Sequence, residues 1–361
     1  MSALVVPVFL VAFFLVAGRP PQAQAQERRP PSGAPQYTER VEVSRILIDV
    51  RAVDDLGNPI RGLSAADFRV RIDGRPTRVE SAYWVGGPSA EPSPAEPSAP
   101  ALQPVPPAAR GRLIVFLFQK DLEPSRIGGL MRMLIETRTF LESIGAEDRV
   151  AVLSFDSHLR VWLDFTSRLD RVRQVLEHGI LFETPKPVEP VLPPSLMSTL
   201  DIVRADRAYS IEEALALLGR ALEPLPGAKS VVYVGHGFGR LLGSSLYFER
   251  AYSEARRALQ AARASVFCLD VTNADSHTLD AGLQATAADT GGFFARTHLF
   301  PDQAMRRLSG ALAGHYVLFV EAESGTRGGR RRQIEVDLAG RKGTVLAKRQ
   351  DVGAWPAAVP R

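Results

Sequence analysis

The chain has a single cysteine and almost no excess charge, and both shortages exclude classes of protein. One cysteine, Cys268, cannot form an internal disulfide, so a small disulfide-stapled fold is excluded. Cys268 lies in the apolar run 264–271, which predicts a small buried side chain rather than a reactive thiol. The 44 basic and 40 acidic residues leave a net charge of +4 in 361 residues. So small an excess of basic residues does not indicate a nucleic-acid partner, which normally requires a concentrated basic face. The one basic run, residues 327–332, is interpreted as a solvated hairpin turn.

The chain also lacks a run of apolar residues long enough for a transmembrane helix, which needs about 20. Its longest run is Ala3–Ala17, followed by the small-x-small triplet Ala23-Gln24-Ala25. This pattern predicts a secretory signal peptide over residues 1–25, cut between Ala25 and Gln26, and hence a secreted or periplasmic protein. If the segment is retained, it would be the only membrane contact we expect.

Motifs of catalysis are missing as well. The six histidines have no metal-binding spacing, and Gly235-His236-Gly237 has no serine to serve as a nucleophile elbow. The loop after it lacks the lysine and hydroxyl of a phosphate-binding loop. We therefore expect no enzyme; a hydrolase with His236 and Asp121 as acid and base is a remote alternative.

The two ends of the chain have β patterns. After a polar, proline-rich spacer predicted to be disordered (26–40), residues 41–86 alternate with period two and contain the hairpin signal Asp73-Gly74. Residues 87–111 form a linker rich in proline. A second β unit spans 315–350. Neither unit is large enough to bury a core without disulfides, so we predict that the two pair into one discontinuous β-sandwich.

Between them, residues 112–314 alternate apolar strands with amphipathic helices. This order predicts an α/β fold, a mainly parallel sheet with helices on both faces. The expected strands are 113–118, 149–155, 160–165, 230–234, 265–271 and 293–295. The expected helices are 127–143, 168–178, 211–222, 246–264, 279–289 and 302–312.

Several short motifs resemble a known family. The segment Asp54–Phe68 with Ile72-Asp73-Gly74 is similar to the opening of the VWFA-related proteins abundant in Acidobacteria. Ala288–Phe293 and Gly314–Leu318 resemble their closing segments. The resemblance covers roughly residues 42–350, and it implies a von Willebrand factor type A fold in an extracytoplasmic binding module.

Type A domains often bind Mg²⁺ where three loops meet, with an Asp-x-Ser-x-Ser loop, a threonine and a third-loop aspartate. By this resemblance the first aspartate position holds Gln119, and the third-loop position holds His236. Imidazole is a poor ligand for Mg²⁺, which prefers oxygen. The degenerate site comprises Gln119, Asp121, Glu123, Ser125, Ser210 and His236, although Ser210 is equally suited to cap a helix.

We therefore expect a non-catalytic module, without cofactor, that binds a protein of the cell envelope or the exterior. Its binding face would be the loops 119–126, 184–210 and 235–243. The alternative is a metal-dependent adhesion module that holds Mg²⁺ or Mn²⁺ weakly through Asp121, Glu123, Ser125 and Ser210.

Overall fold

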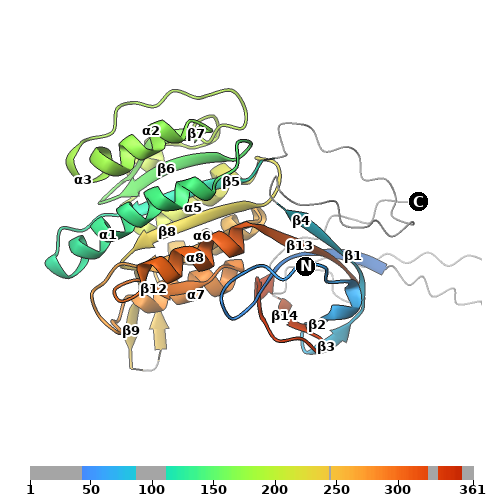
Figure 1. Ribbon diagram of the computed structural model, residues 1–361. Helices are drawn as coiled ribbons and strands as arrows, with labels where there is room; N and C mark the ends of the chain where they lie inside the picture. Colours follow the sequence, from blue (N-terminus) through green and yellow to red (C-terminus); the bar gives the residue numbers. More distant parts are fainter. Residues whose placement is uncertain (1–42, 87–110, 244, 324–331, 352–361) are drawn as a thin grey trace, which may run out of the picture. The chain divides into compact units, whose positions relative to one another are not determined.

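The structure, a computed structural model, describes residues 43–86, 111–243, 245–323 and 332–351. The predicted signal peptide and spacer, the linker up to residue 110 and the basic run at 327–331 lie outside the described residues. Figure 1 shows two parts in the rest of the chain, a layered α/β part and a β part built from both ends of the sequence.

The α/β part contains a six-stranded sheet in the order β12-β11-β8-β5-β6-β7. All neighbouring strands are parallel except β6 and β7, which form an antiparallel hairpin. The central strands are buried along their whole length, because each is mainly apolar and is covered on both faces. Their bounds are β5 Leu113–Gln119, β6 Arg149–Phe155, β7 Leu159–Thr166, β8 Lys229–Gly235, β11 Ala264–Asp270 and β12 Phe294–Arg296.

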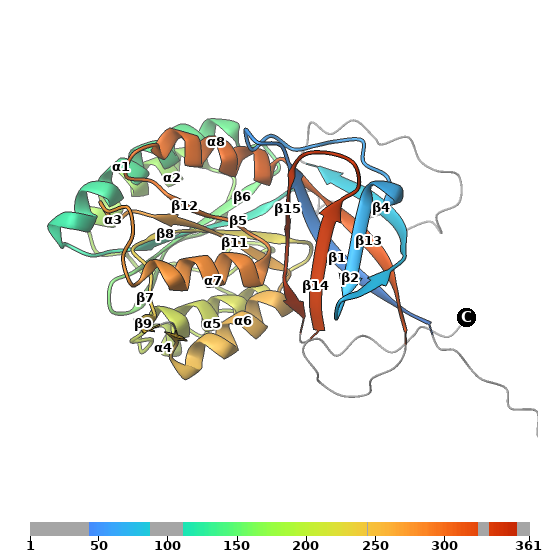
Figure 2. The same cartoon turned by 90° about the horizontal axis from the view of Figure 1, so that it is seen from below.

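Helices cover both faces of this sheet (Figure 2). One core layer joins the sheet to α1, α2 and α8, and the other joins it to α5, α6 and α7. The helices are α1 Pro124–Phe140, α2 Leu169–Gln174, α3 Ile180–Phe182, α4 Ile202–Ala205, α5 Ile211–Leu222, α6 Arg250–Ala261, α7 Asp280–Thr290 and α8 Pro301–Leu312. Short 3₁₀ turns span Ala65–Asp67 and Leu141–Ser143, and a π-helical turn, Val175–Gly179, joins α2 to α3.

The β part consists of two four-stranded antiparallel sheets that share one core. One sheet has the order β15-β1-β13-β4 and the other β16-β14-β2-β3, so each combines strands from both flanks. Tyr316 joins the halves further, since its hydroxyl accepts a hydrogen bond from the N–H of Leu63 and donates one to the carbonyl of Ile60. The strands are β1 Val43–Val53, β2 Phe68–Ile72, β3 Arg75–Thr77, β4 Val79–Gly86, β13 Gly314–Glu323, β14 Arg332–Leu338, β15 Thr344–Ala347 and β16 Gln350–Asp351. The predicted fold class, including the sandwich formed by the two flanks, is confirmed.

Strand β1 also reaches into the α/β part. The guanidinium of Arg51 donates to the carbonyl of Ala311 (3.0 Å) and to Oγ of Ser265 (2.7 Å). Asp49 forms a two-bond ion pair with Arg263, which directly precedes β11. The sandwich is therefore attached to the amino end of the parallel strands, and the opposite edge is left free of it.

Two predicted helices begin elsewhere than expected. Helix α1 starts at Pro124 rather than at residue 127, because proline at the first helical position has no N–H to leave unpaired. Helix α6 starts at Arg250 rather than at 246, and a small hairpin precedes it, β9 Arg240–Leu242 with β10 Ser245–Tyr247. Gly243 turns this hairpin with a φ of 62°, which glycine adopts without strain.

Candidate functional site at the carboxyl edge of the sheet

Three chain segments meet where the parallel strands end. The N–H of Val271, after β11, donates to the carbonyl of Gly235 at the end of β8. The N–H of Asn273 donates to the carbonyl of Ser125 in the first turn of α1. In open α/β sheets, ligands bind at such an edge where the strand order reverses, as it does here beside β5.

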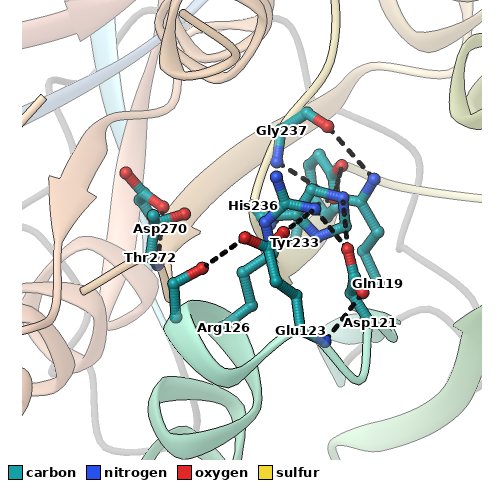
Figure 3. Close-up of polar contacts among 10 residues, drawn as sticks. Gln119, Asp121, Glu123, Arg126, Tyr233, His236, Gly237, Asp270 and Thr272 are labelled. Atoms are coloured by element: carbon teal, nitrogen blue, oxygen red, sulfur yellow. Dashed lines mark hydrogen bonds and ion pairs between the residues drawn. The ribbon is translucent and has the colours of Figure 1, made fainter. Parts of the chain in front are cut away.

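Gln119, in the position of the expected first aspartate, fastens β5 to the loop after β8. Its Oε1 accepts hydrogen bonds from the hydroxyl of Tyr233 (2.7 Å) and the N–H groups of His236 (3.1 Å) and Gly237 (3.0 Å). Its Nε2 donates to the carbonyl of Gly237 (3.1 Å). The side chain is buried, and both ends of its amide are satisfied within the protein (Figure 3).

The two carboxylates of the first loop share a cation that the chain itself supplies. Arg126 forms an ion pair with Asp121, and its Nη1 lies 3.1 Å from Oε2 of Glu123. Burial alone would raise the pKa of Asp121. The N–H of Glu123 and the guanidinium of Arg126 outweigh burial and hold that pKa below its ordinary value. The early start of α1 makes this pairing possible, because it places Arg126 in the first turn of the helix, over the loop.

His236 lies beside this cluster as a neutral imidazole. Burial, followed by the nearby charge of Arg126, lowers its pKa from 6.5 to about 4, against the opposing effect of Asp121. Its Nε2 is 3.8 Å from Oδ2 of Asp121, too far for a hydrogen bond. Its Nδ1 is buried and has no hydrogen-bond partner in the described structure.

The two serines of the expected site are both engaged elsewhere. The hydroxyl of Ser125 donates to Oε1 of Glu123 (3.1 Å). Ser210 caps α5, its Oγ accepting from the N–H of Glu213 (3.2 Å). The structure therefore brings together Gln119, Asp121, Glu123, Ser125 and His236, and within the described residues no hydrogen bond or ion pair joins Ser210 to them.

Sequence reasoning missed several residues here. Tyr233 lies under Gln119, and Arg126 occupies the centre of the acidic loop. Asp270, fully buried, accepts from the N–H of Thr272 (2.9 Å) and lies 2.8 Å from Nε2 of His277. The sequence did contain a signal for Asp270, because it is an acidic residue at the end of an apolar strand.

A cavity of ≈ 500 Å³ opens between the β5 and β6 ends, lined in part by Gln119, Lys120, Asp121 and His236. Large apolar side chains are exposed in several segments near this edge. They are Leu122 (77% exposed), Phe182 (74%), Tyr209 (74%), Tyr247 (56%) and Phe300 (62%). Single exposed apolar residues need no explanation, but four aromatic side chains and a leucine at one end of the domain favour a protein-binding surface, because aromatic residues are enriched in protein interfaces.

The predicted binding face requires one correction. Of the segment 184–210, the C-terminal end lies at this edge, where Tyr209 contacts the ring of His158 in the β6–β7 turn. Its proline-rich first part runs along the flank of β7 instead. The carboxylate of Asp164, near the far end of β7, holds it there by accepting from the N–H groups of Val191 and Leu196.

Within the described residues, no group of three or more histidine, cysteine, aspartate or glutamate side chains is arranged to hold a metal ion. Cys268 is buried in β11, and burial raises the pKa of its thiol far above the ordinary value. No helix in the described part of the chain has the length and apolar content to cross a membrane.

No family model matches the sequence, and no curated protein matches it. Solved structures do. The conserved hypothetical protein BatB from Bacteroides thetaiotaomicron is 15% identical, with 56% of this chain and 97% of that one covered and a TM-score of 0.39. A von Willebrand factor type A protein from Catenulispora acidiphila is 12% identical, with coverage of 81% and 74% and a TM-score of 0.39. Three N-terminal domains of the type V pili tip protein Mfa5 from Porphyromonas gingivalis are 11% identical, with coverage of 73% and 54% and a TM-score of 0.34.

The arrangement of the strands in the sheet identifies the fold of the α/β part. Its parallel strands, its single antiparallel edge strand β7 and its helices on both faces are in the order that the sequence resemblance implies. The α/β part has a von Willebrand factor type A fold. The solved structures are only 11–15% identical, with TM-scores of 0.34–0.39, so the ligand of this type A domain has to be argued from its own residues.

Proposed function

We propose that the chain is a non-catalytic module that binds a protein through the carboxyl edge of its type A domain, outside the cytoplasm and without a metal ion. The observation that carries this proposal is the set of exposed large apolar side chains near this edge, beside a polar centre whose charges are already paired. Aromatic side chains of this kind dominate the energy of protein interfaces. The N-terminal segment supports the location.

The polar centre supports the absence of a metal. Arg126 already neutralises Asp121 and Glu123, so an incoming cation would have to displace a guanidinium held by both carboxylates. Gln119 offers no free oxygen, because its Oε1 accepts three hydrogen bonds. His236 supplies a neutral nitrogen, which suits Mg²⁺ poorly.

The same contacts argue against the remote hydrolase. A general base must lie within hydrogen-bond reach of the group that it deprotonates or orients. Asp121 and His236 are too far apart to act as a pair, and Asp121 is bound by Arg126.

Calorimetry separates this proposal from the metal-dependent alternative. We expect no binding of Mg²⁺ or Mn²⁺ below millimolar concentration to the native chain. Arg126→Gln, which frees the oxygens of Asp121 and Glu123, should introduce weak Mg²⁺ binding. Submillimolar binding by the native chain would instead favour the adhesion module with Asp121, Glu123, Ser125 and Ser210 as ligands.

The binding face itself is tested with a matched pair of variants. Proteins from the native envelope fraction are captured by the mature chain, and each purified candidate is then titrated directly. Tyr209→Ala should weaken binding by about 2 kcal/mol, roughly 30-fold, as expected for an aromatic anchor. Leu56→Ala removes an equally exposed side chain (79%) from a turn of the sandwich and should change nothing. Equal affinities for Tyr209→Ala, Leu56→Ala and the native chain would overturn the assignment of this face.

A further inference from the structure

A proline-rich segment, residues 184–194, crosses the flank of the type A domain, and the proposed function gives it no role. We call it the strap. It reads Thr-Pro-Lys-Pro-Val-Glu-Pro-Val-Leu-Pro-Pro, with five prolines in eleven residues. It follows α3 and contains no helix or strand. In Figure 1 it lies within the green loop that arches around α2 and β7.

The strap is fixed at its far end only. Asp164, on β7, is buried, and its Oδ2 accepts from the N–H of Val191 (3.2 Å) and the hydroxyl of Ser195 (2.6 Å). Its Oδ1 accepts from the N–H of Leu196 (2.7 Å). Residues 184–190 make no hydrogen bond or ion pair with any part of the chain that the structure describes.

Exposure along the strap follows a period of three. Pro185 and Val188 are half-buried, and Val191 is 39% exposed. The residues between them are exposed, and Leu192, which follows Val191, is 86% exposed. A polyproline II helix has three residues per turn, so one of its three stripes would face the protein in this way. The spacing puts Pro187 and Pro190 together on a stripe that faces solvent, and the chain bends after it, at residues 192–194.

The strap does not serve mainly to cover the edge of the sheet. Edge strands are commonly protected by a loop that packs on them. Here a cavity of ≈ 440 Å³ lies between the strap, β7 and α2, lined in part by Trp162, Arg171 and Val188. The strap also turns its largest apolar side chain, Leu192, away from the protein. A segment that is anchored, extended and apolar on its outer side is displayed rather than packed.

We propose that residues 184–191 are a polyproline II ligand for a partner protein with an aromatic-lined groove. Such grooves bind P-x-x-P segments, and the strap contains one before its bend, Pro187–Pro190. The anchoring by Asp164 restricts the strap before binding, which lowers the entropy lost when it is bound. Lys186 and Glu189 are exposed beside the proline stripe, and their charges would determine in which of the two chain directions the strap binds in the groove. The strap lies on the flank of β7, so this interaction is independent of the carboxyl-edge face.

The test uses purified SH3, WW and EVH1 domains as probes, titrated against the whole mature chain. At least one probe should bind the native chain. The triple variant Pro187→Ala, Pro190→Ala, Pro193→Ala should weaken that binding at least tenfold. Leu56→Ala, in a turn of the sandwich, is the matched control and should leave probe binding unchanged. Circular dichroism and urea unfolding of both variants establish that each is folded.

Two results would overturn the proposal. One is that no probe binds the native chain more tightly than it binds the triple variant. The other is that the triple variant self-associates, measured by light scattering, with probe binding unaltered, since the strap would then protect the β7 edge. Loss of binding in Leu56→Ala as well as in the triple variant would also count against it, because the loss would then not be specific to the strap.

Discussion

Gln119→Met removes all four hydrogen bonds of the Gln119 amide while nearly keeping its shape. A typical intramolecular hydrogen bond contributes about 1 kcal/mol net, and a buried donor left without a partner costs about 1–3 kcal/mol. Four bonds would give about 4 kcal/mol if no water replaced them. The adjoining cavity admits water to some of these groups, so we expect a loss of about 2–3 kcal/mol in the free energy of unfolding.

Gln119→Glu is the matched control. It keeps an oxygen that can accept from Tyr233, His236 and Gly237, but when ionised it sets a second carboxylate oxygen against the carbonyl of Gly237. When protonated, its O–H can donate to that carbonyl instead. We therefore expect a cost of about 1 kcal/mol or less relative to the native chain where the new carboxyl is protonated, and a larger cost where it is ionised. Equilibrium urea denaturation measures both variants, and hydrogen–deuterium exchange of the Gly237 amide reports whether the β8 loop opens in Gln119→Met alone. The reasoning is refuted if Gln119→Met unfolds within about 0.5 kcal/mol of the native chain with unchanged exchange at Gly237.

Two further predictions concern acid and the β8 loop. Burial lowers the pKa of His236 and of His315 to about 4, so between pH 6.5 and about 4 the unfolded chain binds more protons than the folded one. The free energy of unfolding should therefore fall as pH decreases through this window, by about 2 kcal/mol per histidine between pH 7 and 5. In His315→Gln, urea unfolding should show a smaller fall over the same pH range. An equal fall in the variant and the native chain would contradict this. Gly237→Ala should cost about 2 kcal/mol or more, because Gly237 has a φ of 89° and an added Cβ would lie 2.3 Å from the carbonyl oxygen of Leu279. A stability equal to that of the native chain would show that the loop tolerates another backbone conformation.

Strong local patterns made most of the fold predictable. The apolar run Leu113–Phe118 could only be a buried strand, and it is the centre of β5. The sandwich followed from the small size of each flank, which needs a partner to bury its apolar face. The hairpin β9–β10 was missed because Leu246–Ala264 was read as one continuous helix, although Gly243 just before it marks the turn of that hairpin.

The candidate site was only half predictable, because its contacts join residues far apart in the sequence. Gln119 and Asp121 could be placed by the resemblance. The bonds from Gln119 to Tyr233 and to the β8 loop have no local signature. Arg126 was overlooked because Pro124 was interpreted as part of a loop, whereas it starts the helix that places the guanidinium over the two carboxylates.

The construction of the sandwich from both flanks affects the order in which the chain can fold. Val43 pairs with Glu323, and Arg51 hydrogen-bonds to a carbonyl 260 residues away. During synthesis, the strands β1, β2 and β4 therefore remain without their pairing strands β13 and β14 until most of the chain has been made. Contacts at such separation slow folding. The sandwich can therefore close only after β13 and β14 have been made.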